Sequence, residues 1–268
     1  MRSSIAELKT SADPKQLGSF GERFVELPVD AEWLSAVAGL AQARHGLFRT
    51  YAQRFARLYL SDFDANALTG MYSMLLLPSG AWQRLLGGRP GGRLLDVGAG
   101  VGDVTSMLGE AFDEIETTEV SRGMAKRLRK RGFRCHALDL TNNALEAPPF
   151  DAISLLNVLD RCQKPRSLLE RCLALLRPGG RLIVALALPY RPFYFAGPTT
   201  PEPLERLECS PTGGSGAWED QARRFLERDL LPLGLSLDCF ARAPYLSAGD
   251  SVRALYELDD VVAVLSKP

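Results

Sequence analysis

The chain has 268 residues, of which 46% are apolar and 24% are charged, proportions that are typical of a soluble globular protein. Lysine and arginine together number 32, as do aspartate and glutamate, so the formal net charge is zero. This balance argues against nucleic acid or an anionic membrane surface as the main partner, and the length allows one large domain or two small ones.

The first 90 residues indicate helices. Residues 1–30 have no clear periodicity, whereas apolar residues between positions 30 and 60 recur at helical spacing. The first apolar residues on one face of that predicted helix are Leu34, Val37, Leu40 and Ala41. A shorter helix is predicted over residues 78–88, where two glycines end it. The three tryptophans, Trp33, Trp82 and Trp218, are expected in the core.

From residue 93 onward, short apolar runs alternate with helical stretches. The predicted strands are RLLDVGAG (93–100), EIETTEV (114–120), FRCHAL (133–138), FDAISLLNV (150–158) and RLIVALAL (181–188). The predicted helices are DVTSMLGEAF (103–112), SRGMAKRLRKRG (121–132) and PRSLLERCLALLRPGG (165–180). Because the strands are continuous apolar runs that alternate with helices, the pattern indicates a parallel sheet covered on both faces.

The C-terminal part has a different rhythm. Residues 189–216 are rich in proline, glycine and serine and predict a loop, and residues 218–234 predict a helix. Two strands follow without a helix between them, at residues 235–244 and 255–267. Such strands are antiparallel neighbours, or one of them inserts antiparallel into the sheet.

The stretch LLDVGAGVGD places Gly98, Gly100 and Gly102 directly after the first predicted strand. Glycines at this point allow a sharp turn and let a ligand approach the backbone beside a helix N-terminus. Glu119 ends the second strand, about 20 residues further on, where an acidic residue accepts hydrogen bonds from ribose hydroxyls in nucleotide-binding α/β folds. Together these features predict a ligand that contains a nucleoside.

The glycine spacing favours S-adenosylmethionine (SAM) over a dinucleotide. The pattern is G-x-G-x-G, whereas G-x-G-x-x-G is typical of dinucleotide sites. Asp96, just before the glycines, would repel a pyrophosphate but suits a cation such as the sulfonium of SAM. A dinucleotide-dependent oxidoreductase is therefore the least favoured interpretation.

Polar residues interrupt the fourth predicted strand, because ISLL is followed by Asn157, Asp160 and Arg161. Burying an amide or a carboxylate without a partner is costly. In an open parallel sheet, ligands bind beyond the carboxyl ends of the strands, which would place these groups at the mouth of the pocket. The alternative is a strand-end turn that caps the next helix, with Arg161 as an ion-pair or surface residue.

Other kinds of site are not indicated. The five cysteines form no C-x-x-C motif and there are two histidines, His45 and His136, so neither a metal site nor a disulfide framework is predicted. The N-terminus lacks the apolar core of a signal peptide, and no apolar run reaches the roughly 20 residues that span a bilayer. We expect an intracellular, cytoplasmic protein, with endomembrane or organellar association left open.

The chain resembles the class I SAM-dependent methyltransferases, whose pattern LLDVGAGVGD, TTEVS and LLRPGGRLIVAL match in order. From about residue 40 to the C-terminus it resembles more closely the DREV family, also called methyltransferase-like protein nine. The segments that carry this resemblance are GMYSMLLLPSGAWQRLL (70–86), NVLDRCQKPRSLL (157–169), ALALPYRPF (185–193), RAPYLSAGD (242–250) and YELDDVVAVL (256–265). Residues 189–203 depart from the family's loop.

The resemblance implies an α/β fold with a Rossmann-like, seven-stranded, mostly parallel sheet whose last strand is antiparallel. A helical N-terminal segment (1–90) would pack on a SAM-dependent methyltransferase domain (91–268). The implied activity is methyl transfer from SAM to the imidazole Nδ1 (π nitrogen) of a protein histidine in a His-x-His motif, which leaves S-adenosylhomocysteine. The implied partners are proteins or peptides that contain His-x-His, and we expect a monomer with no nucleic-acid partner, membrane span or metal.

The family's site residues are carried over position by position. The expected cofactor-binding residues are Asp96, Gly98, Gly100, Gly102, Glu119, Val120, Asp139 and Asn157. The expected catalytic residues are Asp160, which would accept the imidazole Nε2–H so that Nδ1 is free to attack, and Asn157, which would position the ring or the cofactor. The expected substrate-binding residues are Asp160, Arg161, Tyr190, Tyr245 and Tyr256.

Several alternatives stay open. Asp139 could cap a helix or turn, and Tyr245 and Tyr256 could belong to the core. Fold alone does not determine the methyl acceptor, so methylation of another side chain or of a small molecule is the nearest rival. A rival of another class is a SAM-binding protein that is catalytically inactive and serves as a partner.

Overall fold

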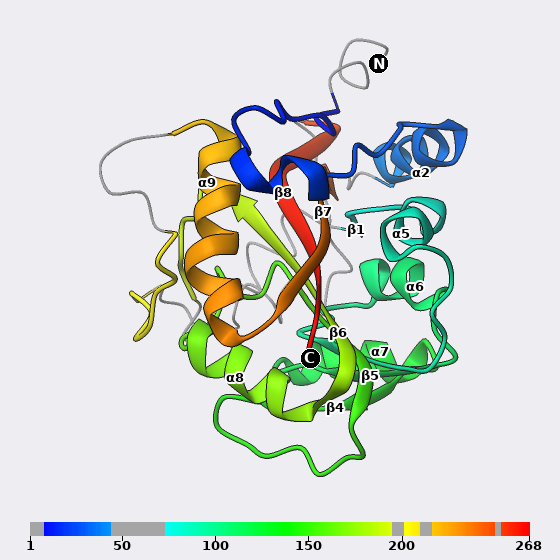
Figure 1. Cartoon of the computed structure of the whole chain (residues 1–268). Coiled ribbons are helices and arrows are strands. Elements are labelled where there is room, and N and C mark those ends of the chain that lie inside the picture. Colours follow the sequence, from blue (N-terminus) through cyan, green and yellow to red (C-terminus); the bar gives the residue numbers. More distant parts are fainter. Residues whose placement is uncertain (1–7, 44–72, 195–200, 210–215, 250–252) are drawn as a thin grey trace.

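The computed structural model describes residues 8–43, 73–194, 201–209, 216–249 and 253–268 (Figure 1). The helical elements are η1 (Gly18–Arg23), α2 (Ala31–Gln42), α5 (Ser79–Leu86), α6 (Asp103–Gly109), α7 (Arg122–Lys130), α8 (Pro165–Leu175), α9 (Trp218–Phe225), η2 (Leu226–Leu230) and η3 (Leu231–Leu233). The strands are β1 (Met74–Leu75), β2 (Arg93–Val97), β3 (Glu114–Thr118), β4 (Arg134–His136), β5 (Phe150–Leu156), β6 (Leu176–Leu188), β7 (Ser236–Ala248) and β8 (Leu255–Ser266).

The strands form one eight-stranded sheet in the order β1-β7-β8-β6-β5-β2-β3-β4. β2 pairs in parallel with β3 and β5, β3 with β4, and β5 with β6. β8 lies antiparallel between β6 and β7. The predicted Rossmann-like sheet with an antiparallel last strand is therefore confirmed. The difference is an eighth strand at the edge, the two-residue β1, which pairs antiparallel with β7.

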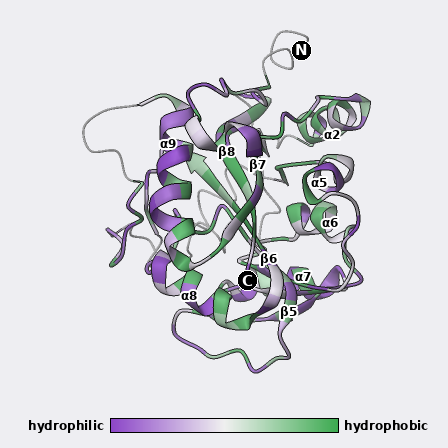
Figure 2. Cartoon of the chain, in the orientation of Figure 1, coloured by the Kyte–Doolittle hydropathy of each residue, from purple (hydrophilic) through white to green (hydrophobic). Residues whose placement is uncertain are grey.

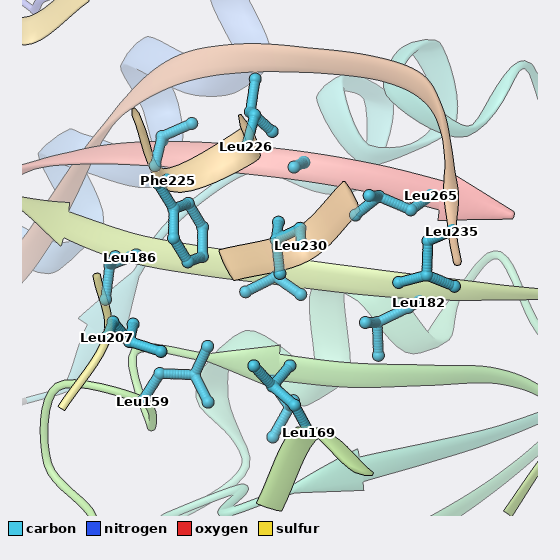
Figure 3. Packing of buried hydrophobic residues seen from close by; sticks show 14 of the residues in the cluster. Leu159, Leu169, Leu182, Leu186, Leu207, Phe225, Leu226, Leu230, Leu235 and Leu265 are labelled. Carbon is cyan, nitrogen blue, oxygen red and sulfur yellow. The ribbon is translucent and has the colours of Figure 1, made fainter. Parts of the chain in front are cut away.

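Helices cover both faces of the sheet, with α8 and α9 on one side and α2, α5 and α6 on the other (Figure 1). On the α8/α9 side, Phe225 and Leu230 pack among strand residues that include Leu182, Leu186 and Leu265 (Figure 3). The central strands β6 and β8 are accordingly mostly hydrophobic in colour, whereas α9 carries hydrophilic residues along much of its length (Figure 2).

Because both faces of the sheet are covered, β6 is apolar at consecutive positions. Leu182, Val184 and Leu186 of β6 belong to the core beneath α8 and α9, whereas the alternate residues Ile183 and Ala185 belong to the core beneath α2 and α5. Side chains of a strand point alternately to the two faces of a sheet, so a strand covered on both sides needs apolar residues throughout. The continuous run predicted a buried parallel strand for this reason.

The helix α2 begins at an N-cap, because the side chain of Asp30 accepts a hydrogen bond of 3.0 Å from the backbone N–H of Trp33. Its buried face consists of Trp33, Val37, Leu40 and Ala41. The prediction that Leu34 lies on this face is wrong: Leu34 is 41% exposed, because the bulkier Trp33 occupies the core beside it. The predicted continuation of the helix beyond residue 43 lies outside the described residues.

The tryptophans lie where the sequence predicted, whereas one predicted helix ends earlier than expected. Trp33, Trp82 and Trp218 are buried, as expected for core tryptophans. The helix α8 ends at Leu175 instead of residue 180, because β6 begins at Leu176, which pairs with Phe150 of β5. Within the described ranges, no helix combines the length and apolarity that crossing a bilayer would require.

Candidate functional site

A pocket of about 660 Å³ lies where the parallel strands β2, β3 and β5 end. Three segments that follow these strands line it: residues 98–101 after β2, residues 119–120 after β3 and residues 157–158 after β5. The carboxyl edge of a parallel sheet is where ligands bind in open α/β folds. We call the part formed by Asp96, Gly98, Gly100, Glu119 and Asp139 the glycine end of the site.

The turn after β2 depends on glycines. Gly98 and Gly100 have φ angles of +71° and +59°, a backbone region that glycine adopts without strain. A Cβ on Gly98 would lie 2.8 Å from Cγ2 of Val158, whereas a Cβ on Gly100 would meet nothing within 4 Å. The turn therefore passes close to the segment after β5 and leaves its own backbone accessible to a ligand.

Gly102, which was predicted to bind cofactor, does not line the pocket. It is the residue before α6, and a Cβ there would lie 2.8 Å from Cδ2 of Leu128 and 3.0 Å from the ring of Phe133. The geometry gives Gly102 a packing role, because it lets the start of α6 lie against α7.

Asp96 is the buried carboxyl group of the glycine end. It accepts hydrogen bonds of 2.6 Å from the hydroxyls of Thr105 and Ser154, and it lines the pocket. Burial raises the pKa of Asp96 to about 6, although both hydroxyls favour its ionised form. Near neutral pH this group therefore contributes a negative charge to the pocket, which suits a cationic ligand.

Glu119 joins two of the segments that line the pocket. Its Oε2 accepts a hydrogen bond of 2.9 Å from the backbone N–H of Gly100, and its Oε1 accepts one of 2.8 Å from the N–H of Ser121. A carboxylate oxygen can accept more than one hydrogen bond, so Glu119 can still receive ribose hydroxyls. Val120 follows it in the pocket wall and is exposed, which offers an apolar surface beside the carboxylate.

Asp139 lines the pocket after β4 and also caps a turn. Its Oδ1 accepts hydrogen bonds from the backbone N–H and the hydroxyl of Thr141, at 2.8 Å and 2.7 Å, and its Oδ2 accepts one of 2.8 Å from Asn142. These local bonds correspond to the turn-capping alternative. Its contact with a cofactor stays a prediction.

A second group of residues lies where β5 ends, and we call Asn157, Asp160, Arg161, Tyr245 and Asp260 the β5 end of the site. Asn157 has a φ of 56° and its backbone N–H donates a hydrogen bond of 3.0 Å to the carbonyl of Ala185 on β6. Its Nδ2 donates a hydrogen bond of 2.5 Å to Oδ2 of Asp260 on β8. Its Oδ1 is buried and has no hydrogen-bond partner among the described residues.

Asp160 and Asp260 are carboxyl groups that share this incomplete pairing. Oδ2 of Asp160 lies 3.5 Å from Nε of Arg161, while Oδ1 of each aspartate has no partner within the described part of the chain. Both residues are buried, with exposures of 5% and 0%. Burial raises the pKa of Asp160 and raises that of Asp260 further, and the Arg161 guanidinium opposes the rise at Asp160.

The predicted substrate residues are divided between the pocket and its surroundings. Asn157, Arg161 and Tyr245 line the pocket, and the guanidinium of Arg161 lies 5.7 Å from the ring centre of Phe193. Asp160 lies between the core residue Leu159 and the lining residue Arg161 in the chain, and it does not itself line the pocket. The hydroxyl of Tyr245 contacts Sδ of Met74, another lining residue.

Tyr190 and Tyr256, which were predicted to bind substrate, do not line the pocket. Tyr190 is 2% exposed in the core beneath α8 and α9, where its hydroxyl accepts a hydrogen bond of 3.4 Å from the N–H of Leu207. Tyr256 is exposed near the start of β8, and the guanidinium of Arg253 lies 5.8 Å from its ring centre. The strand positions alone did not show which tyrosines face the pocket.

The sequence prediction did not name Asp260 or four lining residues, Met74, Gln163, Phe193 and Tyr194, although all of them except Tyr194 lie within segments that carry the family resemblance. Nε2 of Gln163 donates a hydrogen bond of 3.0 Å to the hydroxyl of Tyr194, which joins the segment after β5 to the segment after β6. A signal for Asp260 was present, because it precedes the apolar run VVAVL in a buried strand, where a carboxyl group is unusual.

The donor set fits SAM rather than a metal ion. Among the described residues, no group of three or more histidine, cysteine, aspartate or glutamate side chains could hold a metal. Asp96 offers charge to a cationic ligand, Glu119 offers acceptors to a ribose, and the turn at Gly98 and Gly100 offers an open backbone. These are the contacts that a sulfonium-bearing nucleoside with an amino-acid tail requires.

Comparison with protein families gives a match to the DREV methyltransferase family over residues 18–267. The match covers nearly the whole chain and includes the glycine end, the β5 end and the helix α2. The match begins at residue 18, whereas the resemblance noted from the sequence begins at about residue 40.

Curated relatives match a smaller part of the chain. A ubiquinone biosynthesis O-methyltransferase from Xylella fastidiosa (strain 9a5c) is 32% identical over 104 residues, which cover 35% of this chain and 42% of that protein. A demethylmenaquinone methyltransferase from Renibacterium salmoninarum is 32% identical over 110 residues, which cover 39% and 46%. The chain thus spans less than half the length of these relatives.

Solved structures of low identity also match. The N-methyltransferase NodS from Bradyrhizobium japonicum WM9, in complex with S-adenosyl-L-homocysteine, has 17% identity and a TM-score of 0.46, with 71% of this chain and 85% of that chain covered. The magnesium protoporphyrin IX methyltransferase ChlM from Synechocystis PCC 6803 has 16% identity and a TM-score of 0.44, with 70% and 79% covered.

Proposed function

This chain belongs to the DREV methyltransferase family, and on that premise we propose that it methylates Nδ1 of a protein histidine within a His-x-His motif. Membership of this family, together with the carboxylates and the open glycine turn at the glycine end, supports methyl transfer with SAM as the cofactor. The proposal concerns the acceptor, and the residues at the β5 end support it.

The observation that carries the proposal is a set of buried acceptor atoms beside the pocket. Oδ1 of Asn157 and Oδ1 of Asp160 have no donor among the described residues. A buried acceptor without a donor costs free energy of about 1–3 kcal/mol, so a ligand that supplies N–H groups would be favoured there. A neutral imidazole supplies one N–H and, on its other nitrogen, a lone pair that can attack a methyl group.

Asp160 does not line the pocket but directly precedes the lining residue Arg161, and it would set the tautomer of a substrate histidine whose ring reaches past this part of the wall. If its Oδ1 accepts the Nε2–H, the Nδ1 lone pair is free, as the aspartate of a hydrolase triad arranges for its histidine. The same carboxylate stabilises the positive charge that develops on the ring while the new N–C bond forms. Burial raises the pKa of Asp160, and the neighbouring Arg161 guanidinium opposes that rise and so supports the ionised form that this role requires.

The methyl transfer needs little further acid–base assistance from the chain. SAM supplies a methyl group on a positive sulfonium, and the C–S bond breaks as the N–C bond forms. A histidine is already largely neutral at pH 7, because its ordinary pKa is about 6.5. The proton on Nε2 then leaves toward Asp160 and solvent, so the main contributions of the chain are in-line placement and electrostatics.

A second candidate acceptor is a small molecule. The names of the curated relatives point to quinone-type substrates, although those matches cover 35% to 39% of this chain. Phe193, Tyr194 and Tyr245 line the pocket and would also suit an aromatic ring. A quinol O–H could also donate to the buried acceptors, so what favours histidine is the family match over residues 18–267, against 35% to 39% of the chain for the curated relatives.

The test is an incubation of the protein with SAM and one of three acceptors: a peptide with His-Ala-His, the same peptide with Ala-Ala-Ala, or a quinol. Mass spectrometry is expected to show one added methyl on the histidine peptide and none on the alanine peptide. Methylation of the quinol alone would favour the second candidate. Calorimetric binding of SAM without turnover of any acceptor, including a pool of histidine-rich proteins, would support an inactive binding protein.

A further inference from the structure

The carboxyl group of Asp260 does not line the pocket. Its hydrogen bond with the side chain of Asn157 connects it to a residue that does. Asp260 belongs to β8, where its cross-strand neighbours are Ala187 on β6 and Ala243 on β7. It is fully buried, and its Oδ2 accepts the 2.5 Å hydrogen bond from Nδ2 of Asn157. A charged residue is rarely buried this completely among apolar neighbours without a specific partner, and here the described partner is Asn157.

The chemistry of an amide explains what this bond controls. The two ends of an asparagine side chain have nearly the same shape, but the NH₂ end donates and the oxygen end accepts. An oxygen of Asp260 accepts the NH₂ end whether Asp260 is ionised or neutral, because a neutral carboxyl group keeps its carbonyl oxygen. The bond therefore decides which end of the amide faces the sheet and which end is left for the pocket.

The backbone of Asn157 restricts the side chain further. Its φ of 56° lies in the left-handed region, and its N–H is held by the carbonyl of Ala185. Among the described residues it is the one non-glycine residue with a positive φ. With the backbone held by β6 and the NH₂ group held by β8, the remaining atom of the amide is Oδ1, which has no partner in the described chain and belongs to a residue that lines the pocket.

We propose that Asp260 is a positioning residue for methyl transfer: it holds the NH₂ end of the Asn157 amide, so that the buried Oδ1 is the end left to accept an N–H from a ligand in the pocket. The proposal rests on the methyltransferase activity and on the pocket, and it does not require that the acceptor is histidine. A merely structural Asp260 would stabilise the sheet and would affect turnover only through folding.

The first test is a double-mutant cycle on kcat/KM. Asp260→Ala is expected to reduce kcat/KM by about tenfold to a hundredfold, the range found when a group that orients a functional ligand is removed. Asn157→Ala is expected to reduce it at least as much, and the double variant should be no worse than Asn157→Ala alone. If the two reductions multiply in the double variant, Asp260 does not act through Asn157 and the proposal fails.

Two further variants separate positioning from folding. Asp260→Asn keeps an acceptor oxygen in a side chain of the same size, so its kcat/KM is expected to stay close to that of the unmodified protein. This expectation can be tested even if Asp260→Ala does not fold. Asp259→Ala is the matched control, because Asp259 is the adjacent residue on β8 and pairs with Arg242 at 2.6 Å instead of Asn157. Its kcat/KM should stay near that of the unmodified protein. An Asp260→Asn variant as impaired as Asp260→Ala would contradict the proposal.

The hydrogen bond itself can be observed without an acceptor substrate. The chain has four asparagines, Asn66, Asn142, Asn143 and Asn157, so selective ¹⁵N labelling gives few side-chain amide signals. The Asn157 pair is expected to contain one strongly downfield proton that disappears in Asp260→Ala and persists in Asp259→Ala. It should also shift when S-adenosylhomocysteine and acceptor bind. If no histidine peptide is methylated, only the histidine proposal fails. If the Asn157 signal is unchanged in Asp260→Ala, the positioning role of Asp260 is overturned.

Discussion

The two ends of the site differ in how completely their polar groups are paired. At the glycine end, Asp96 accepts from two hydroxyls and Glu119 accepts from two backbone N–H groups. At the β5 end, Asn157, Asp160 and Asp260 each have one buried oxygen without a donor among the described residues. The fold alone completes the first set of hydrogen bonds and leaves the second set incomplete.

This difference separates the two tasks of the pocket. At the glycine end, the carboxylates are held in place by hydrogen bonds from the chain before a ligand binds. Less conformational entropy is therefore lost when the ligand binds. Buried polar atoms without partners are uncommon in folded proteins, and where they occur they call for a functional explanation. We therefore propose that the glycine end binds the cofactor and that the β5 end recognises the acceptor, and each of the following predictions tests one side of that comparison.

The largest effect is expected from Asp160→Ala. Because the proposed role of Asp160 is to orient the acceptor and stabilise its developing charge, kcat should fall by about a hundredfold or more, as for other groups that stabilise transition-state charge. Binding of SAM, measured by calorimetry, should change little, because Asp160 belongs to the β5 end. Near-normal turnover with intact SAM binding would remove Asp160 from the mechanism.

A smaller effect, on the other side, is expected from Glu119→Ala. Loss of charge-assisted hydrogen bonds to ribose, worth about 1.5–3 kcal/mol each, should weaken SAM binding by roughly tenfold to a hundredfold. At saturating SAM, kcat should recover toward that of the unmodified protein. Glu114→Ala is the control, because Glu114 lies at the opposite end of β3 and its side chain is 69% exposed. Equal losses in the two variants would show that the effect does not come from the pocket.

The smallest effect concerns pH and Asp96. Its pKa of about 6 means that the carboxylate predominates at pH 7 and that the neutral acid predominates at pH 5. Since the negative charge attracts a cationic ligand, the affinity for SAM should fall as the pH is lowered through 6, by about tenfold between pH 7 and pH 5. Calorimetry at the two pH values measures this change.

Asp96→Asn supplies the control for the pH effect. The amide cannot ionise, so this variant should bind SAM weakly at both pH values and with little change between them. A variant that keeps the full pH dependence would show that another group is responsible.

Much of the fold was predictable because burial on both faces of a sheet leaves a simple pattern. The strands β2 and β5 and the second half of β6 are mostly apolar, and their alternation with helices indicates parallel pairing. Two strands without a helix between them indicated antiparallel pairing of β7 and β8, and the family resemblance implied that the last strand runs antiparallel in the sheet. The strand β1 was not predictable, because two residues carry no periodicity and their pairing with β7 depends on contacts that are distant in sequence. The position of Leu34 was misjudged because a neighbouring tryptophan can occupy the same helix face.

The site was predictable where its chemistry is local in sequence. The glycine turn, Asp96 and Glu119 lie near strand ends that the pattern reveals, and the structure places them at one pocket. The pairing of Asn157 with Asp260 joins residues 103 positions apart, and no spacing rule connects them. Tyr190 and Tyr256 also show this limit, because the facing of a side chain near a strand end depends on the loops that pack against it.

The most direct measurement of the central claim is the position of the transferred methyl group. After reaction of the protein with SAM and a His-Ala-His peptide, the product is hydrolysed and its methylhistidine is compared with standards of the two ring isomers. If the β5 end holds the Nε2–H through Asp160, the methyl is found on Nδ1 alone, and Asp160→Ala loses this product. A methyl on Nε2, or on Nδ1 with equal yield from Asp160→Ala, would contradict the assignment of the β5 end to acceptor recognition.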